Sequence, residues 1–433
     1  MTVRDRDAIW AVPLAAALLL WPAIWNGYPI VFADTGTYLS QAIHRYLGWD
    51  RPPFYSLFML PLHMMHSVWP VVVAQAVLAV CAIRLVCDAM LPGIGVRWLP
   101  VAVLPLAVGT WLPFLVCQLM PDVFTPLLVL VLCTGMPRWR WVAFAAFAIA
   151  AQQSSVLLAV AVSSVLAIWH YRGDGVGRGP SALRTILPIP LAIAGLLSVN
   201  FIGHGRLAIS PFGNVFLLAR IVYDGPGMDV LRRDCPAAGW RLCPYLDRFP
   251  ALSDEFLWRS DSPIVLAGGH KTVSAEADAI IAAALAAEPG RELRAMLRNA
   301  REQMTRFASG DGLEAWPIEV SPWIEHDFPP VEVARYASSL QARGLLVLPP
   351  WLALLHRCAI LGGTVWCGCL LPLALERRHR AAVFLLVALA ILPASAAITG
   401  GLSTPHDRYQ SRVAWVPPFV AALSAIALVR RPA

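Results

Sequence analysis

Lysine and charge of either sign are scarce in this chain. Lys271 is the only lysine among 433 residues, and charged residues make up 14% of the sequence, whereas a soluble domain averages about 25%. Hydrophobic residues account for 58% of the chain, and the mean hydropathy is +0.62. This composition excludes an ordinary soluble globular protein and predicts a polytopic integral membrane protein.

Several motifs that identify common protein classes are also missing. The sequence has no glycine-rich nucleotide-phosphate loop and no Gly-x-Ser-x-Gly nucleophile motif. His204 and His406 do not stand at a recognisable metal-ligand spacing from the acids. There is no internal repeat of the kind that marks many transporters. The first apolar segment, 8–25, lacks a small-x-small cleavage site, so we expect it to remain as the first membrane helix.

Long apolar segments dominate the rest of the chain. A spanning helix needs roughly 20 apolar residues. The segment 141–169 is too long for one comfortable span and contains Gln152-Gln153, so we expect two short helices that form a re-entrant hairpin. The sequence therefore predicts an all-α polytopic membrane protein with about ten transmembrane helices. The expected segments are 8–25, 68–88, 98–117, 121–136, 141–169, 185–203, 355–375, 381–399 and 413–429.

The arginines are distributed unevenly between the loops that join these segments. The short loops expected on one side, leaving aside the polar block 204–343, carry only Arg45, Arg51, Arg408 and Arg412. The positive-inside rule then places the other side, and with it both termini, in the cytoplasm. Arginines between apolar segments are typical of topology determinants, so the formal net charge of +7 does not predict a nucleic-acid partner. The arginines expected on the cytoplasmic side are Arg4, Arg6, Arg84, Arg97, Arg138, Arg140, Arg172, Arg178, Arg184, Arg377, Arg378, Arg380, Arg430 and Arg431.

The pattern of polar and apolar segments divides the chain into three parts. We expect an N-terminal transmembrane module over 1–203, in which residues 26–67 form the first outer loop. Residues 204–343 are expected to form a small, mostly helical extracytoplasmic domain, and 344–433 the C-terminal transmembrane helices with an outer loop at 400–412. Within the polar block the sequence predicts helices over 274–287, capped by Ser274, over 290–307 and over 331–343, and an extended stretch over 313–330.

Two of the nine cysteines lie in the polar block. Cys235 and Cys243 are spaced C-x7-C, and a disulfide between them is expected if the block faces an oxidising compartment. The alternative is a pair of free thiols. The other seven cysteines lie in apolar segments, where a free cysteine acts as a small hydrophobic residue.

Asp34 is the first candidate for chemistry. It stands just past the first apolar segment, and a carboxylate at the edge of the membrane can accept a proton from an acceptor hydroxyl. The alternative is a structural role, because Asp34 can cap a helix running from Thr35 to Leu47. Both roles are compatible with a rigidly held carboxylate.

Two arginine-containing loops are expected on the same side as Asp34. In Arg51-Pro52-Pro53-Phe54-Tyr55 the prolines stiffen the loop, and an arginine suits bidentate phosphate binding. Arg408 and Arg412 lie in the polar stretch 403–412, where an anionic lipid phosphate would hold them. The alternative in both loops is an interfacial arginine whose charged group snorkels to water.

Other polar residues on this side are weaker candidates for substrate binding. Asp122 follows a proline at the start of a short span and can orient an acceptor or a metal, or simply cap the helix. Gln152 and Gln153 can bind a ligand or each other. The full set of substrate-binding candidates is Tyr38, Tyr55, Asp122, Gln152, Gln153, His406, Asp407 and Tyr409, and the start of the polar block adds His204, Asn214, Arg220 and Asp224.

Asp34, Tyr38 and Arg51-Pro52-Pro53-Phe54-Tyr55 together resemble the first outer loop of the GT-C superfamily, the integral membrane glycosyltransferases that use polyprenyl-phosphate sugars. In that superfamily the loop carries an acidic residue near the end of the first helix, then aromatic residues and often an x-Pro-Pro-aromatic run. The resemblance covers roughly the first 200 residues. This chain departs from the superfamily pattern in having a single acid, Asp34 followed by Thr35, where most relatives have a pair.

The resemblance implies an inverting glycosyl transfer on the outer face of a bacterial inner membrane. Asp34 would act as the general base on the acceptor hydroxyl, and Arg51, Arg408 and Arg412 would bind the donor phosphate. The implied partners are a polyprenyl-phosphate sugar, a glycan, lipid or protein acceptor, and membrane lipids. The resemblance implies no need for a nucleotide site and fixes no cofactor, although a divalent metal is a possible one.

Two other functions are carried as alternatives. A transporter or flippase of lipid-linked glycans would require ionisable residues that line a path through the membrane. A non-catalytic envelope assembly protein would use residues 204–343 as a binding platform, although that role does not account for Asp34 together with Arg51.

Overall fold

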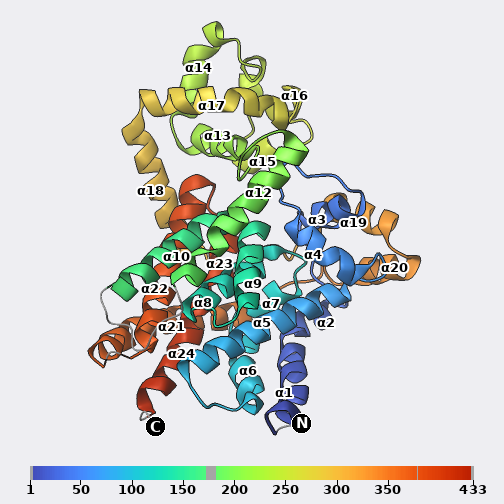
Figure 1. Cartoon of the computed structure of the whole chain (residues 1–433). Helices are drawn as coiled ribbons and strands as arrows, with labels where there is room; N and C mark the ends of the chain where they lie inside the picture. Colours follow the sequence, from blue (N-terminus) through green and yellow to red (C-terminus); the bar gives the residue numbers. More distant parts are fainter. Residues whose placement is uncertain (1–2, 172–181, 378, 431–433) are drawn as a thin grey trace.

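The computed structural model describes residues 3–171, 182–377 and 379–430, and within these ranges the chain is helical, with no β-strand. Figure 1 shows a long bundle that contains both chain ends and a smaller helical unit at the opposite end. The first half of the chain forms α1 (Val3–Leu19), α2 (Trp21–Asn26), α3 (Thr35–Ile43), α4 (Phe54–His63), α5 (Trp69–Met90), η1 (Val96–Trp98), α6 (Leu99–Gly109), α7 (Leu112–Cys117), η2 (Pro121–Val123), α8 (Phe124–Cys133), α9 (Trp139–Ala151), α10 (Ser154–Tyr171), α11 (Ala182–Ile186) and α12 (Pro188–His204). The second half forms α13 (Gly213–Asp224), α14 (Gly227–Ala238), η3 (Cys243–Arg248), α15 (Ser253–Trp258), α16 (Pro263–Leu266), α17 (His270–Ala287), α18 (Pro289–Thr305), α19 (Pro317–Asp327), α20 (Pro330–Ser338), α21 (Pro350–Glu376), α22 (Ala381–Leu402), α23 (Asp407–Ala414) and α24 (Val416–Val429).

Five helical segments of the described chain are long and apolar enough to cross a membrane: Trp69–Met90, Leu183–His204, Pro350–Glu376, Ala381–Leu402 and Asp407–Val429. The expected number of about ten spans is not confirmed, because several expected segments form shorter helices. The segment 8–25 is divided at Leu20, where Pro22 starts a new helix, and 98–117 is divided at Thr110 ahead of Pro113. A proline favours the first turn of a helix and disfavours its interior, which explains both divisions.

The break expected in the segment 141–169 is present. Helix α9 ends at Ala151 and α10 begins at Ser154, so Gln152 and Gln153 lie between two helices. Gln152 is extended, with φ −137° and ψ 102°, and its backbone N–H closes the last turn of α9 on the Ile149 carbonyl.

Some of the arginines used to predict the orientation of the chain lie outside the described residues: Arg172, Arg178, Arg378 and Arg431. The start of α1 and the end of α24 lie at the same end of the bundle, away from the smaller helical unit (Figure 1).

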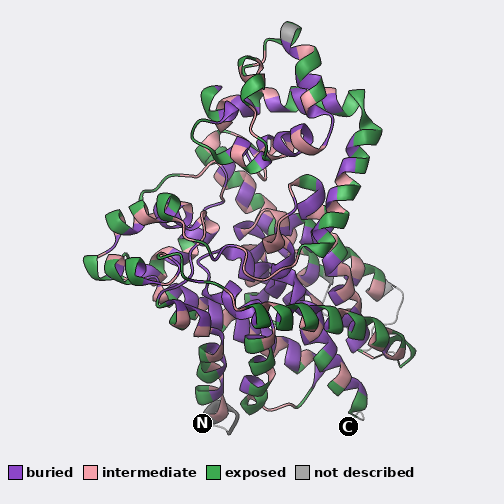
Figure 2. Cartoon of the chain, turned by 180° about the vertical axis from the view of Figure 1, so that it is seen from behind, coloured by how far each residue is buried: buried purple, intermediate pink, exposed green. Residues whose placement is uncertain are grey.

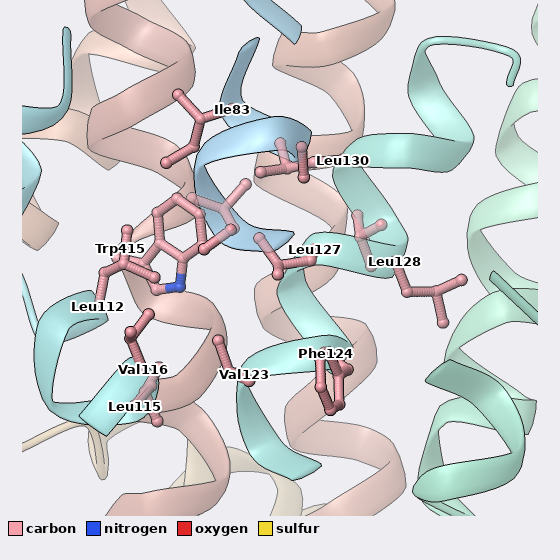
Figure 3. Close-up of a cluster of buried hydrophobic side chains, with 14 of the residues drawn as sticks. Ile83, Leu112, Leu115, Val116, Val123, Phe124, Leu127, Leu128, Leu130 and Trp415 are labelled. Carbon is pink, nitrogen blue, oxygen red and sulfur yellow. The ribbon is translucent and has the colours of Figure 1, made fainter. Parts of the chain in front are cut away.

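The core of the bundle is a continuous cluster of buried apolar residues. Figure 2 shows the buried residues in purple, and they run along the middle of the bundle. Trp415 is fully buried in this core and lies among side chains of α5, α7 and α8, as the close-up in Figure 3 shows. This position places the turn between α23 and α24 inside the core of the bundle. Helix α23, which carries Arg408 and Arg412, is therefore held against the helices of the first half of the chain.

A second, separate apolar core lies within residues 215–284, to which α13–α17 contribute. A disulfide joins Cys235 to Cys243 at the edge of this unit, with a Cα–Cα distance of 5.3 Å. The rest of the expected extracytoplasmic block packs on the bundle, because Leu313, Val320 and Ile324 belong to the first core. The block 204–343 thus contributes to both cores.

Two local predictions within the block were wrong. Ser274 lies inside α17, where its hydroxyl donates to Asn214 and accepts from Arg206, so it does not cap the helix. Residues 317–327 form α19, where the sequence predicts an extended stretch. Pro317 starts this helix at a position that tolerates proline, and the packing of Val320 and Ile324 on the bundle outweighs the cost of Pro322 in its interior.

Candidate functional site

Asp34 lies at the N-terminal end of α3, but its side chain makes no capping hydrogen bond to the described helix. Its Oδ1 instead accepts a hydrogen bond from Arg51 Nη2 at 2.8 Å. Its other oxygen, Oδ2, lies 3.7 Å from Arg408 Nη1. Asp34, the expected base, therefore contacts Arg51 and Arg408, two of the expected phosphate ligands. Its carboxylate pairs with these arginines and does not cap α3.

The two arginines control the ionisation of this carboxylate. Burial by itself would raise the pKa of Asp34, but the guanidinium groups of Arg51 and Arg408 outweigh burial and lower it. The neighbouring Asp50 lies 3.6 Å from Arg51 Nε. Its pKa is raised by burial and by the charge of Asp34, against the opposing effect of Arg51. Asp34 is therefore the acid of the pair that stays ionised most readily.

Arg408 approaches Asp34 from the far end of the sequence. Its guanidinium carbon lies 4.0 Å from the centre of the Phe32 ring, a cation–π geometry, and its backbone N–H donates to Asp311 Oδ2 at 2.7 Å. Phe32 precedes Asp34 by two residues, so the chain entering α3 contacts Arg408 through both a ring and a carboxylate.

Arg412 forms a second ion pair one turn further along α23. Its Nη1 lies 3.0 Å from Asp122 Oδ1, and its Nη2 donates to Ser154 Oγ at 3.2 Å. The Tyr409 ring joins the two ion pairs, since its centre is 5.4 Å from the guanidinium carbon of Arg408 and 5.7 Å from that of Arg412. Asp122 thus takes part in the cluster through its side chain.

Hydrogen-bond donors outnumber acceptors among the unsatisfied groups of this cluster. Three buried guanidinium nitrogens make no hydrogen bond to any described residue: Arg51 Nε, Arg408 Nη1 and Arg412 Nε. Among the carboxylate oxygens of the cluster, Asp122 Oδ2 is the one that is buried without a hydrogen bond to a described residue. An unpartnered buried donor is costly. The cluster therefore has spare capacity for an anion with several acceptor oxygens.

The aromatic residues of the first loop pack beneath this cluster. The rings of Tyr38 and Tyr55 meet edge to face at 5.0 Å, and both side chains are fully buried. The hydroxyl of Tyr55 donates to Gln75 Oε1 at 2.7 Å. Burial, with Asp34 nearby, raises the pKa of Tyr38. Both tyrosines are thus held rigidly in the buried part of the first loop, with Tyr38 close enough to Asp34 to be affected by its charge.

The remaining sequence candidates hold neighbouring segments together. Gln153 Nε2 donates to the Ile209 carbonyl, and Asp407 Oδ1 accepts from the Ala308 backbone N–H. His406 Nε2 lies 3.4 Å from Asp254 Oδ2. The structure brings none of these side chains, nor that of Gln152, into the ion pairs described above.

The four candidates at the start of the polar block also lie elsewhere. His204 contacts the Gly48 carbonyl, Asn214 contacts Asp278, Arg220 pairs with Glu292, and Asp224 accepts from Asn299.

Sequence reasoning missed Phe32, Asp50, Ser154 and Asp311. Asp50 directly precedes Arg51, which was a usable signal. Asp311 and Ser154 contact α23 across more than 90 residues of sequence, and no local pattern marks them.

The cluster is nearly closed to solvent, with 13% of the Asp34 side chain and 12% of the Arg408 side chain exposed. An open groove of about 470 Å³ lies close by, lined by Ser309, Gly310, Leu313, Glu314, Ala315, Gly344, Leu346, Val347 and Leu348. Asp311, which binds the Arg408 backbone, belongs to the loop that forms one wall of this groove. The groove and the cluster therefore share the loop 309–315.

Comparison of the chain with protein-family models, with curated proteins and with solved structures finds no match.

Proposed function

We propose that this protein is an inverting glycosyltransferase that moves a sugar from a polyprenyl-phosphate donor to an acceptor hydroxyl. The observation that carries the proposal is that Arg51 and Arg408 both pair with the Asp34 carboxylate, while each of them, like Arg412 beside Asp122, keeps one buried N–H that makes no hydrogen bond in the described part of the chain. A phosphate offers the acceptor oxygens that such arginines bind strongly. The resemblance of the first loop to the GT-C superfamily agrees with this assignment.

In the proposed reaction the donor phosphate takes over contacts that Arg51 and Arg408 make with Asp34. Losing these two cations would raise the basicity of Asp34 when the substrate is in place. The acceptor oxygen then attacks the anomeric carbon from the face opposite the phosphate, and its proton passes to Asp34. The bond between the anomeric carbon and the phosphate oxygen breaks, and its electron pair leaves on the phosphate, where the arginines stabilise the charge.

The groove beside the loop 309–315 gives the lipid part of the donor a place in this scheme. Leu313, Leu346, Val347 and Leu348 provide apolar lining just before α21, a helix long enough to span a membrane. A polyprenyl chain lying there would bring its phosphate toward the wall that contains Asp311. We place the protein in a bacterial inner membrane, with this face outward and both termini in the cytoplasm. The acceptor is a glycan, lipid or protein hydroxyl.

Mass spectrometry of envelope glycans and lipid-linked sugars tests the proposal. A host lacking the gene is complemented with wild type, Asp34→Asn or Asp88→Asn. Asp88 is the control because it pairs with Arg84 on α5, four residues away, outside the cluster. We expect wild type and Asp88→Asn to restore the missing sugar, and Asp34→Asn to lower transfer by at least about 100-fold. Full restoration by Asp34→Asn, present at wild-type level, would remove Asp34 from the chemistry.

One observation favours transport as the second candidate. Arg412 and Asp122 form a buried ion pair between Asp407–Val429 and an apolar helix, as a path through a membrane would require. Purified protein in detergent distinguishes the two functions, since an enzyme transfers the sugar without a sealed compartment and a transporter moves its substrate only across one. A scaffold would show neither activity.

A further inference from the structure

We propose that His44, His326 and Asp327 form a binding site for a divalent first-row transition metal of the zinc type. His44 follows α3, the helix that begins beside Asp34, and the other two residues stand at the end of α19. One ligand atom from each of the three lies within 4.8 Å of the others. The site is separate from the arginine cluster, and the proposal does not depend on the glycosyltransferase assignment.

The Asp327 carboxylate lies between the two imidazoles. His44 Nε2 is 3.0 Å from one of its oxygens, and His326 Nδ1 is 2.7 Å from Oδ1. The Asp327 side chain is only 4% exposed, whereas those of His44 and His326 are 33% and 72% exposed. The anion is therefore buried at the base of the site, and the two histidines can turn at its rim.

Asp327 has no arginine or lysine partner in the described part of the chain, where its ion pairs are with these two histidines. This distinguishes it from Asp34 and Asp122, each of which faces a guanidinium group. A buried carboxylate is costly unless a cation or hydrogen bonds compensate it. A bound divalent cation would supply that compensation directly.

The donor set selects the class of metal. Two imidazole nitrogens and one carboxylate oxygen are the ligands of many three-residue zinc sites, which leave a fourth position for water. Calcium and magnesium prefer oxygen ligands, so two histidines disfavour them. Zinc ligands stand about 2.0–2.2 Å from the ion, which puts the ligand atoms of a tetrahedral site roughly 3.4 Å from one another. The two imidazole nitrogens, now 3.0 and 2.7 Å from the Asp327 oxygens, therefore have to move a few tenths of an ångström away from the carboxylate, and the exposed His326 side chain is free to make that movement.

The site would fasten α19 to α3. The two helices already touch, because a Cβ on Gly36 would lie 2.0 Å from the Glu319 carbonyl oxygen. His44 and Asp327 are 283 residues apart in the sequence, which explains why no ligand spacing reveals the site. A metal bound by these three residues would hold the C-terminal end of α3, the helix that begins beside Asp34, against the C-terminal end of α19.

Binding of Zn²⁺ and Co²⁺ to the purified full-length protein in detergent tests the proposal. The protein is first treated with a chelator, and binding is then measured by calorimetry for Zn²⁺ and by visible absorption for Co²⁺. We expect one equivalent of metal and a Co²⁺ spectrum typical of nitrogen and oxygen ligands. His44→Gln and His326→Gln should each weaken binding by at least about 100-fold, since even outer-shell changes cost 10–100-fold.

Glutamine can still donate a hydrogen bond to Asp327, so these variants are expected to fold. His66→Gln is the matched control, because His66 is an exposed histidine in the turn after α4 that contacts the Met64 carbonyl. Wild-type protein that binds neither ion would overturn the proposal. So would equal affinity in His44→Gln, His326→Gln and wild type, or an equal loss in His66→Gln.

Discussion

Arg412 Nη1 lies 3.0 Å from Asp122 Oδ1, and the two side chains are only 2% and 1% exposed. They are 290 residues apart in the sequence, and the pair joins α23 to η2, the short turn that precedes α8. The pair lies one helical turn from Arg408, which faces Asp34.

Breaking this pair on one side should destabilise the protein strongly. Arg412→Met leaves the Asp122 carboxylate buried without its cation, and we expect a loss of about 3–5 kcal/mol in the free energy of unfolding. Unfolding by denaturant in detergent micelles measures the change. The double variant Asp122→Leu with Arg412→Met should recover most of the loss, because two apolar side chains need no compensation. A double variant as unstable as the single one would show that the pair is not the source of the effect.

The stabilising contribution of Asp34 should disappear in acid. Its pKa is lowered in the folded protein, after the arginines outweigh burial, relative to about 3.9 in an unfolded chain. A lowered folded-state pKa stabilises the protein above the unfolded-state value, and this stabilisation is lost as the pH falls through the folded-state value. Wild type should therefore exceed Asp34→Asn in stability at pH 7, and the difference should shrink below about pH 4. Unfolding midpoints measured from pH 7 to pH 3 check this, and a constant difference would contradict it.

The disulfide between Cys235 and Cys243 should stabilise the unit formed by α13–α17. The bond closes a short loop, with a sequence separation of 8, and the loop-entropy relation gives about 2–3 kcal/mol for such a loop. In the double variant Cys235→Ser with Cys243→Ser, backbone amides of residues 213–287 should exchange hydrogen faster, while those of α22 should not. Cys358→Ser, which changes an exposed free cysteine, is the control. Unchanged exchange in the double variant would rule out a stabilising role.

Gly400 should be intolerant of any side chain. A Cβ there would lie 2.6 Å from the Asn299 carbonyl oxygen, so α18 and α22 would have to move apart. We expect Gly400→Ala to destabilise the protein by about 1–3 kcal/mol. Gly401→Ala is the matched control on the same helix, because its nearest neighbouring atom would be 3.8 Å away. Thermal unfolding of the two variants side by side gives the comparison, and equal midpoints would argue against tight packing at Gly400.

Local sequence patterns predicted much of the helical framework. The apolar segments, the break at Gln152-Gln153 and the helices over 274–287 and 290–307 each depend on neighbours within a few turns. The prediction failed where packing decided the outcome. Pro317 and Pro322 indicate an extended stretch, yet α19 forms there because its apolar face packs on the bundle.

In the candidate site, too, local patterns could be predicted from the sequence and long-range contacts could not. Asp34 and Arg51 were recognisable because they share one loop and stand 17 residues apart. Their direct contact could not be predicted, because the local pattern suits Asp34 to a general base and Arg51 to a phosphate ligand and does not show that the two side chains pair. Arg408 and Asp311 join the cluster through contacts that span the chain, and these depend on how α23 lies against the first loop.

Residues that are neighbours in the chain already specify that it is helical and apolar, where several helices begin and end, and which short segments carry ionisable groups. Hydropathy and the helix-breaking effect of proline depend on residues that are close in the chain, so they can be read without a structure. The ion-pair partners are specified by the packed fold. Asp34 pairs with Arg51 and Arg408, Asp122 pairs with Arg412, and His44 contacts Asp327. These pairs depend on the packing of helices that are far apart in the sequence, and many arrangements of the same helices would satisfy the local patterns equally well.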